Sequence, residues 1–240
     1  MEILNHPKGL RTLFFTEMWE RMSFYGMRGI LVLFMTASLL EGGLEIDPVS
    51  ASAVYGIYSS SVYLMALLGG WLADRHIGQQ KAILYGGFII MIGHFLLAFT
   101  SIETFYLGLV MVVLGTGLLK PNISAIVGDL YEKNSDKKEA GFTIFYMSIN
   151  IGSILGFFIC GYLGENIGWH YGFGAAGIGM AFGLTQFLLT KKNLNKVGIN
   201  QVKLYVNDSL IINNKINYLS YNETNYVSRY IDFHLYKKLR

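Results

Sequence analysis

Six long apolar stretches, separated by short polar segments, dominate this sequence of 240 residues. Each stretch can cross the hydrocarbon core of a bilayer, which needs roughly 20 helical residues. The stretches lie near residues 14–40, 51–73, 82–101, 104–127, 141–164 and 168–190. Only 15% of the residues are charged and the mean hydropathy is +0.40, whereas a soluble domain carries about 25% charged residues. We therefore predict an all-α membrane protein with six transmembrane helices.

The polar segments between the stretches alternate in charge. Basic residues gather on one side: Lys8, Arg11, Arg75, Lys81, Lys133, Lys137, Lys138, Lys191, Lys192 and Lys196. Acidic residues, with almost no Lys or Arg, occupy the other side: Glu41, Glu45, Asp47, Glu103 and Glu165. The positive-inside rule then puts both ends of the chain in the cytoplasm. We expect a multi-pass protein of the cell membrane, in particular a bacterial inner membrane.

Several function classes are excluded by what the sequence contains. The net charge is only +3 and the basic residues sit in short loops, so we expect no nucleic-acid partner. Cys160 is the only cysteine, and His94 and His170 lack partners at metal spacing, so we predict no disulfide framework and no metal site. No glycine-rich phosphate loop and no nucleophile–base constellation is visible. We therefore expect neither a cofactor nor an enzymatic activity.

Ionisable residues lie inside the first apolar stretch, in the segment Thr16–Arg28. Glu17, Glu20, Arg21 and Arg28 fall on one helix face at 100° per residue, together with Phe24 and Tyr25. Charged groups at this depth are costly, and they are tolerated where they pair with one another or face a water-filled cavity. This face of the first helix is therefore a candidate functional site.

The fourth stretch contains a lysine within Gly115-Thr116-Gly117-Leu118-Leu119-Lys120-Pro121-Asn122. Lys120 needs a carboxylate partner or water at this depth. The alternative, a side chain that snorkels to the interface, is disfavoured by about a dozen apolar residues on its N-terminal side. Pro121 removes a backbone donor, so we expect the helix to bend or loosen there.

Polar and aromatic residues on other stretches could complete a binding pocket. Asn150, on the fifth stretch, could hydrogen-bond a peptide-like ligand or, equally, a neighbouring helix. Tyr55 and Tyr63 could line the pocket with Phe24 and Tyr25, although single aromatic residues more often pack or lie at interfaces. Gly152 and Gly156 form a Gly-x-x-x-Gly face for close helix packing.

The segment after the second stretch, Gly69-Gly70-Trp71-Leu72-Ala73-Asp74-Arg75-His76-Ile77-Gly78, combines glycines with a tight charged loop. It resembles the signature loop between helices 2 and 3 of the major facilitator superfamily. The spacing of Gly70, Asp74, Arg75 and Gly78 carries this resemblance.

With these motifs together, residues 5–190 resemble the N-terminal half of a proton-dependent oligopeptide transporter, of the POT family. The resemblance rests on four motifs in order: Glu17-x-x-Glu20-Arg21-Met22-x-Phe24-Tyr25-Gly26, the Gly69–Gly78 loop, Gly115-Thr116-Gly117-x-x-Lys120-Pro121-Asn122, and Phe145-Tyr146-x-x-Ile149-Asn150-x-Gly152-Ser153. The family usually has Phe in place of Met22 and Tyr in place of Phe24. The missing hydroxyl at Phe24 removes one contact to ligand or water.

The resemblance implies a fold and a set of roles. Residues 1–192 would form the six-helix N-terminal half of a major facilitator fold. Proton coupling would involve Glu17, Glu20, Arg21 and Lys120, and a di- or tripeptide would face Arg21, Tyr25, Arg28, Tyr63, Lys120 and Asn150. A proton gradient would supply the energy. The other partners would be the lipid bilayer and a complementary C-terminal half or a second copy.

The physical chemistry of these groups suggests how coupling would work. A peptide carboxylate needs cations, for which Arg offers a bidentate fork and Lys a point charge. Protonating Glu17 or Glu20 would loosen a pair with Arg21 or Lys120 and release the cation to the substrate. We therefore predict a pH-dependent pair between the first and fourth helices. The alternative functions are a major facilitator carrier of another small solute and a non-transporting membrane fragment.

The composition changes abruptly beyond residue 192. Residues 193–240 are rich in Asn and contain neither an apolar span nor a clean amphipathic period. One interpretation is a disordered cytoplasmic tail. The other is an aberrant sequence that follows damage to the reading frame.

Overall fold

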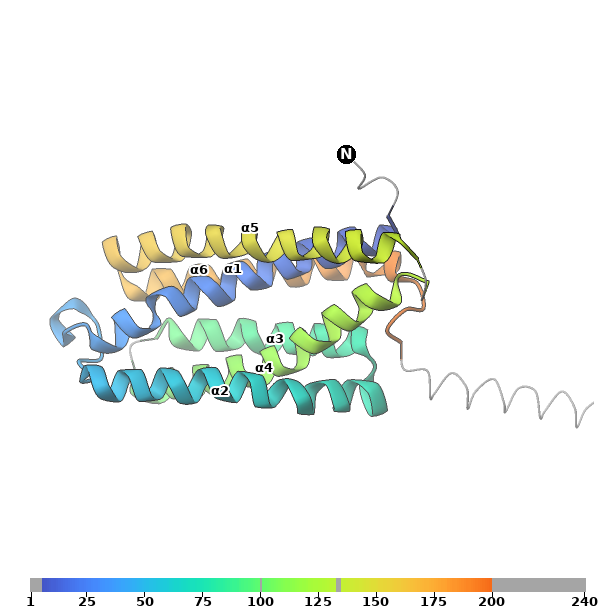
Figure 1. Ribbon diagram of the computed structural model, residues 1–240. Helices are drawn as coiled ribbons and strands as arrows, with labels where there is room; N and C mark the ends of the chain where they lie inside the picture. Colours follow the sequence, from blue (N-terminus) through green and yellow to red (C-terminus); the bar gives the residue numbers. More distant parts are fainter. Residues whose placement is uncertain (1–5, 100, 133–134, 200–240) are drawn as a thin grey trace, which may run out of the picture. The chain divides into compact units, whose positions relative to one another are not determined.

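The computed structural model describes residues 6–99, 101–132 and 135–199, which form a bundle of six long helices (Figure 1). Their bounds are α1 Lys8–Thr36, α2 Pro48–Leu72, α3 Gln79–Leu97, α4 Ile102–Asp129, α5 Lys137–Asn166 and α6 Trp169–Thr190. The described residues contain no strand. The predicted all-α architecture with six helices is confirmed.

The first helix begins and ends earlier than its apolar stretch predicts. α1 ends at Thr36 rather than near residue 40, because Ala37 and Ser38 are extended. Leu39–Glu41 then form a 3-10 turn (η2), which the Ser38 side chain caps by accepting a hydrogen bond from the Glu41 backbone N–H at 3.3 Å. The side-chain cap competes with helix continuation.

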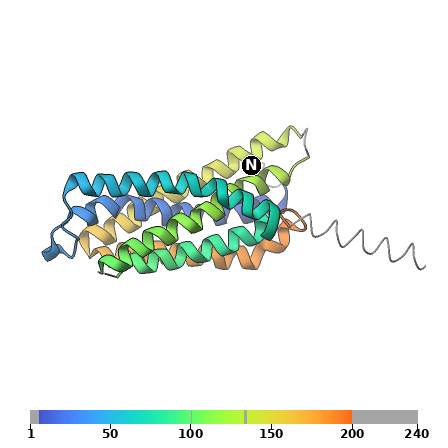
Figure 2. The ribbon, with the colours of Figure 1, turned by 90° about the horizontal axis from the view of Figure 1, so that it is seen from below.

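Five of the six helices, α2 to α6, are long and apolar enough to cross a membrane. α1 does not meet the same criterion, because Glu20, Arg21 and Arg28 lower its hydropathy. It nevertheless runs the length of the bundle beside α5 and α6 (Figures 1 and 2). The chain is a multi-pass membrane protein whose one polar helix is sheltered by its apolar neighbours.

The bundle consists of two groups of three helices. α1 packs mainly against α5 and α6, whereas α4 packs against α2 and α3. Contacts between α3 and α6 join the two groups, and α2 and α5 lie on opposite sides of the bundle (Figure 1). The charged face of α1 and the lysine of α4 therefore belong to different groups.

Glycines allow the closest helix approaches in both groups. A Cβ on Gly156 of α5 would lie 2.4 Å from the Met22 carbonyl oxygen of α1. A Cβ on Gly69 of α2 would lie 2.0 Å from the Gly117 carbonyl oxygen of α4. The predicted packing role of the Gly-x-x-x-Gly face on α5 is confirmed, because Gly152 also meets α1 backbone, at Met18.

The charged loop after α2 is a continuation of that helix. Ala73–Ile77 form a π-helical turn (η3), and Gly78 ends it with a φ of +83°, a conformation that favours glycine. Asp74 and Arg75 are exposed. Asp74 accepts a hydrogen bond from Gln79 Nε2 at 3.5 Å, and the Arg75 guanidinium carbon lies 5.7 Å from the Trp71 ring centroid.

The segment after α6 folds back onto the bundle. A short 3-10 helix, η4, covers Lys191–Leu194, and Leu194 is fully buried. Gln80 of α3 donates from Nε2 to the Val197 carbonyl at 2.6 Å and from its backbone N–H to the Gly198 carbonyl at 3.0 Å. The predicted tail of residues 193–240 therefore starts with a packed segment, and its residues from 200 onward lie outside the described part of the chain.

Candidate functional site

The charged face of α1 is buried inside the bundle. Glu17, Glu20 and Arg21 have only 3%, 0% and 2% of their surface exposed. Arg21 Nε lies 2.7 Å from Glu17 Oε1 and 2.6 Å from Glu20 Oε2. The spacing of one and four residues places all three groups on adjacent turns of one helix. The three residues, which we call the α1 charge cluster, therefore form a compact ion network.

The network leaves part of the guanidinium free. Both carboxylates approach a single nitrogen, Nε, instead of the two-pronged edge that Arg offers to a carboxylate. Within the described residues, Arg21 Nη2 and Glu20 Oε1 are buried without a hydrogen-bond partner. Two carboxylates and one guanidinium leave a formal charge of −1 when both acids are ionised. A proton or a second cation would neutralise the cluster, and a free guanidinium nitrogen remains for an incoming anion.

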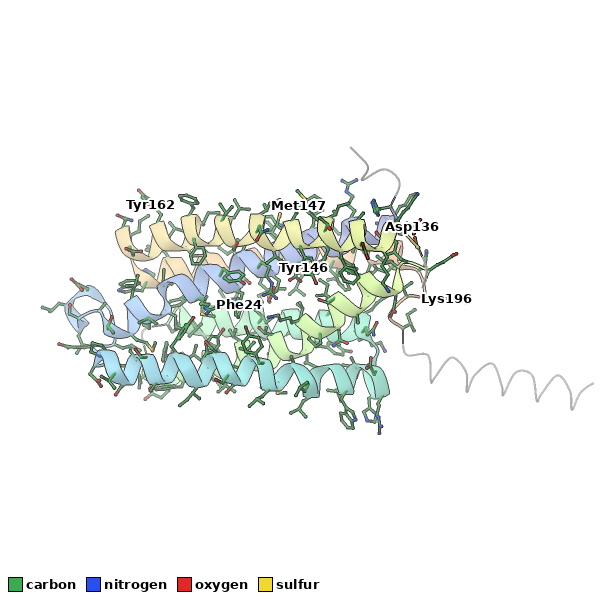
Figure 3. All side chains as sticks on the ribbon, viewed as in Figure 1. Phe24, Asp136, Tyr146, Met147, Tyr162 and Lys196 are labelled. Atoms are coloured by element: carbon green, nitrogen blue, oxygen red, sulfur yellow. The ribbon has the colours of Figure 1, made fainter. Side chains whose placement is uncertain are left out.

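Aromatic rings of α1 lie next to Arg21, Phe24 toward α2 and Tyr25 toward α5. The Arg21 guanidinium carbon lies 5.4 Å from the centroid of Phe24, a buried ring that lies between α1 and α2 (Figure 3). Tyr25 is half-buried, and its ring lies edge-on to Phe24 and 6.1 Å from Phe157 of α5. The Phe24 ring thus contributes to the burial of Arg21.

Arg28 links α1 to α2. Its Nε donates a hydrogen bond to the Tyr55 hydroxyl, and its guanidinium carbon lies 5.3 Å from the centroid of the same ring. Arg28 is only partly buried, so part of its guanidinium can bind a further group. The structure therefore assigns Tyr55 a contact to a candidate substrate-binding residue.

Lys120 does not form the ion pair that the sequence predicts. Its Nζ lies 5.2 Å from the centroid of Tyr63 on α2, and among the described residues it has no carboxylate within 4.0 Å. The expected pair is absent because Arg21, on the same helix as both acids, already contacts them without any rearrangement between helices.

The helix around Lys120 is held by its neighbours despite Pro121. α4 continues through this proline to Asp129. Pro121 supplies no N–H to the Gly117 carbonyl one turn before it, and Gly69 of α2 packs directly against that carbonyl. Asn122 Nδ2 donates to the Leu118 carbonyl at 2.7 Å and to the Gly69 carbonyl at 3.3 Å. These contacts fix the position of Lys120 relative to α2.

Asn150 lies apart from the buried cluster. It is exposed on α5, and its amide makes no hydrogen bond to any described residue. The interhelical hydrogen bond considered from the sequence is therefore not formed. Two residues further along α5, Gly152 contacts α1 at Met18 and Arg21, so Asn150 lies at the edge of the α1–α5 contact.

Tyr58 of α2 is a buried polar residue next to the site that the sequence motifs did not point to. Only 4% of it is exposed, and its hydroxyl has no hydrogen-bond partner among the described residues. Tyr58 lies one turn of α2 beyond Tyr55, which accepts the hydrogen bond from Arg28. The spacing of Tyr58 could have indicated its place near the site, because it follows Tyr55 by three residues and so lies on the same helix face.

A family profile and curated relatives match the chain. The profile described as the POT family (PTR2) matches residues 80–229. The chain is 51% identical over 197 residues to the uncharacterized transporter YclF of Bacillus subtilis (strain 168), covering 81% of this chain and 40% of that protein. It is 48% identical over 185 residues to the peptide transporter YePEPT of Yersinia enterocolitica, covering 76% and 36%. A di-/tripeptide transporter of Lactococcus lactis is 44% identical, with 74% and 36% covered.

Solved structures match the fold over most of the chain. A crystal structure of a peptide transporter POT in complex with sulfate has a TM-score of 0.80 and 44% identity, covering 90% of this chain and 46% of that one. A POT family transporter in complex with 5-aminolevulinic acid has a TM-score of 0.80 and 36% identity, covering 90% and 47%. The chain thus spans less than half the length of the proteins it matches. The predicted half-bundle of a major facilitator fold is confirmed.

Proposed function

The chain belongs to the POT family, and we propose that it is the N-terminal half of a carrier that couples di- and tripeptide symport to protons. The α1 charge cluster is the observation that carries this proposal. A buried network of two acids and one guanidinium, with an unused guanidinium nitrogen, suits exchange between a proton and an anionic ligand. The relatives named as peptide and di-/tripeptide transporters supply the substrate class.

The proposed coupling is competition for cations. When Glu17 and Glu20 are ionised, they hold Arg21 through Nε. Protonating one of them weakens its attraction to the guanidinium, which can then turn its free edge to the carboxylate of a peptide. Lys120 lies on the opposite helix group and would supply the second cation. The proton gradient provides the energy, and the residues act without a cofactor.

The remaining site residues would orient the peptide. Arg28 and Tyr25 present partly buried groups on α1, and Tyr63 is exposed beside Lys120. Asn150 would hydrogen-bond a peptide group from α5. Residues of α1, α2 and α5 would thus approach a ligand whose carboxylate is anchored at Arg21 or Lys120.

A complementary half is the partner that the outer faces of α2 and α5 favour. Of the five apolar helices, these two bury the smallest share of their apolar window, 17% and 22%, against 44% to 50% for the others. Large side chains such as Met147 and Tyr162 point outward from α5 (Figure 3). We propose that these faces pack against a C-terminal half or a second copy. Transporters of this type place the substrate between two halves that rock against each other.

The alternating loop charges support a location for the protein. Lys8 and Arg11 lie at the start of α1, and Lys191 and Lys192 follow the end of α6. We propose that both of these ends face the cytoplasm of a bacterial cell, with the bundle in its inner membrane.

Uptake by proteoliposomes tests the proposal. A labelled dipeptide should accumulate under an imposed inward proton gradient when the chain is reconstituted together with the C-terminal half of a relative. A sugar should not accumulate. Uptake of the sugar instead would favour the alternative of a carrier for another solute. If a correctly assembled pair took up neither compound, the chain would be a non-transporting fragment.

Variants separate coupling from binding. In an intact relative, Ala at the position of Lys120 should abolish proton-driven accumulation while peptide exchange without a gradient is less affected. Full accumulation in that variant would contradict the role of Lys120 in coupling.

A further inference from the structure

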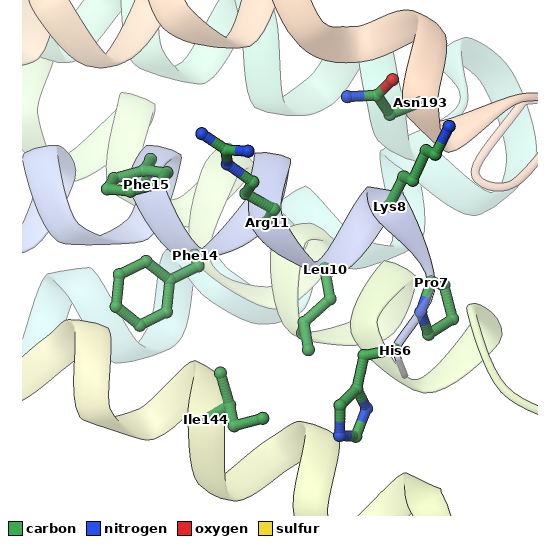
Figure 4. A pocket seen from close by; sticks show the side chains of 9 residues that line it. All are labelled: His6, Pro7, Lys8, Leu10, Arg11, Phe14, Phe15, Ile144 and Asn193. Carbon is green, nitrogen blue, oxygen red and sulfur yellow. The ribbon is translucent and has the colours of Figure 1, made fainter. Parts of the chain in front are cut away.

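A cavity at the start of α1 lies outside the proposed transport site. It measures about 560 Å³ and lies between α1, α5 and the segment after α6 (Figure 4). The residues that line it are His6, Pro7, Lys8, Leu10, Arg11, Phe14, Phe15, Ile144 and Asn193. We call it the α1 entry cavity. The α1 charge cluster begins at Glu17, so none of its residues line this cavity.

The α1 entry cavity has one basic wall and one apolar wall. Lys8 and Arg11 are exposed and lie one helical turn apart on the side of Asn193. Phe14 and Ile144 form the opposite, apolar side (Figure 4). No residue that lines the cavity is acidic. The first turn of α1 also lacks an acidic residue and a side-chain cap, so no side chain there neutralises the partial positive charge of the helix N-terminus.

The cavity straddles the boundary between the helix ends and the apolar part of the bundle. Lys8 is the first residue of α1, whereas Ile144 lies two turns inside α5, which begins at Lys137. A molecule in the cavity would therefore place one end at the membrane surface and the other at the depth of the apolar side chains. Basic pockets of this kind, between transmembrane helices, bind anionic lipid headgroups.

From these observations we propose that the α1 entry cavity binds an anionic phospholipid, with its phosphate between Lys8 and Arg11 and an acyl chain against Phe14 and Ile144. The volume suits this occupant, because ligand pockets typically measure about 300–1,000 Å³. A cavity of this volume would hold the lipid headgroup and the first part of one acyl chain. A zwitterionic peptide fits less well, since no carboxylate is present for its ammonium group. Free phosphate would leave the apolar wall unused.

Binding of defined lipids to the purified 240-residue chain tests the proposal. In detergent micelles, native mass spectrometry would compare phosphatidylglycerol with phosphatidylcholine of the same acyl chains. We expect a preference for phosphatidylglycerol of roughly thirtyfold, about fivefold for each basic residue. The double variant Lys8→Gln, Arg11→Gln should lose this preference. The control Lys191→Gln, Lys192→Gln removes the same charge at the same end of the bundle, outside the cavity, and should keep it.

A second comparison separates the lipid from its headgroup. Glycerol 3-phosphate carries the phosphate without acyl chains, so it should bind far more weakly than phosphatidylglycerol. Phe14→Ser should weaken binding of the lipid and leave binding of glycerol 3-phosphate unchanged. Equal affinity for the two probes would show an anion site only, and equal loss of preference in both double variants would show a general surface-charge effect. Either result would overturn the proposal.

Cross-linking of the unmodified chain keeps the proposal testable if a variant fails to fold. Phosphatidylglycerol with a photoreactive acyl chain should label Phe14, Phe15 or Ile144 in preference to the outer faces of α2 and α5. Labelling spread evenly over those outer faces would contradict a specific site.

Discussion

Lys120 of α4 lies over the ring of Tyr63 on α2, with its ammonium nitrogen 5.2 Å from the ring centroid. Tyr63 is 67% exposed, so this cation–π contact sits at the open side of the α2–α4 pair. The carboxylates of α1 contact Arg21 instead, and none lies within 4.0 Å of Lys120 among the described residues. A change that breaks the Glu20–Arg21 contact would leave an unpaired carboxylate, which would attract the Lys120 ammonium group.

A double-mutant cycle of Lys120→Met and Tyr63→Leu measures this contact. We expect a coupling energy of about 0.5–1 kcal/mol in the free energy of unfolding, because the ring is largely exposed. Tyr63→Phe keeps the ring face and should preserve the coupling. Equal losses for Phe and Leu at this position would show that the hydroxyl, and not the ring, holds the lysine.

Arg21→Met should destabilise the bundle, because it leaves two buried carboxylates without their cation. Unfolding in denaturing detergent should show a loss of about 3–5 kcal/mol. The triple variant Glu17→Gln, Glu20→Gln, Arg21→Met removes all three charges and should recover most of that loss. If it recovers none, the packing of the Arg21 side chain rather than its charge stabilises the site.

The loss in Arg21→Met should also depend on pH. A protonated carboxyl group needs no cation, so lowering the pH from about 8 to about 5 should reduce the deficit of the variant relative to the wild type. Stability of the variant is then expected to fall as the pH rises. A deficit that is constant over this range would contradict titration of the two acids between these pH values.

Tyr58→Phe should leave stability unchanged or raise it. The hydroxyl is buried without a partner among the described residues, so removing it costs no hydrogen bond and relieves up to about 1 kcal/mol of desolvation. Tyr55→Phe is the matched control, since it removes the hydrogen bond from Arg28 and should lower the free energy of unfolding by about 1 kcal/mol. A loss at Tyr58 as large as that at Tyr55 would reveal a bound water.

Gly156→Ala should separate α1 from α5. Its Cβ would meet the backbone of α1 at 2.4 Å from Met22 O and 2.7 Å from Gly26 N, and overpacking of this kind costs about 1–3 kcal/mol. Gly161→Ala, on the same helix, meets nothing within 4 Å and should gain up to about 1 kcal/mol from helix propensity. Thermal unfolding of the two variants gives the comparison, and a stable Gly156→Ala would contradict the close crossing.

Asp47→Ala should weaken the start of α2. Asp47 Oδ1 accepts hydrogen bonds from the backbone N–H groups of Val49 and Ser50, at 3.1 and 3.0 Å. Hydrogen bonds from Ser50 and Val49 hold the pKa of Asp47 below its ordinary value of 3.8. A pKa that is lower in the folded chain stabilises it above that value, and the stabilisation is lost as the pH falls through the folded pKa. The unfolding temperature of Asp47→Ala should therefore lie below wild type at neutral pH and approach it in acid, with Asp47→Asn close to wild type throughout.

Helix number and the polar face of α1 were predictable from local patterns. Each apolar stretch exceeds the length of a span, and a period of 3.6 residues alone puts Glu17, Glu20 and Arg21 on one face. The C-terminal end of α1 was less predictable, because Ala37 and Ser38 are extended although apolar residues follow them, and Ser38 caps the separate turn η2.

Local sequence patterns therefore suffice to predict the six helices, the membrane environment and which ionisable residues share a helix face, because each of these depends on contacts within a few residues. The partners of these ionisable residues depend on the tertiary structure. It paired Arg21 with acids of its own helix and Lys120 with Tyr63, and it buried the hydroxyl of Tyr58. These pairings depend on which helices are in contact and on their relative positions along the bundle axis. Glycines such as Gly69 and Gly156 fix those positions through close backbone contacts between helices that are distant in sequence.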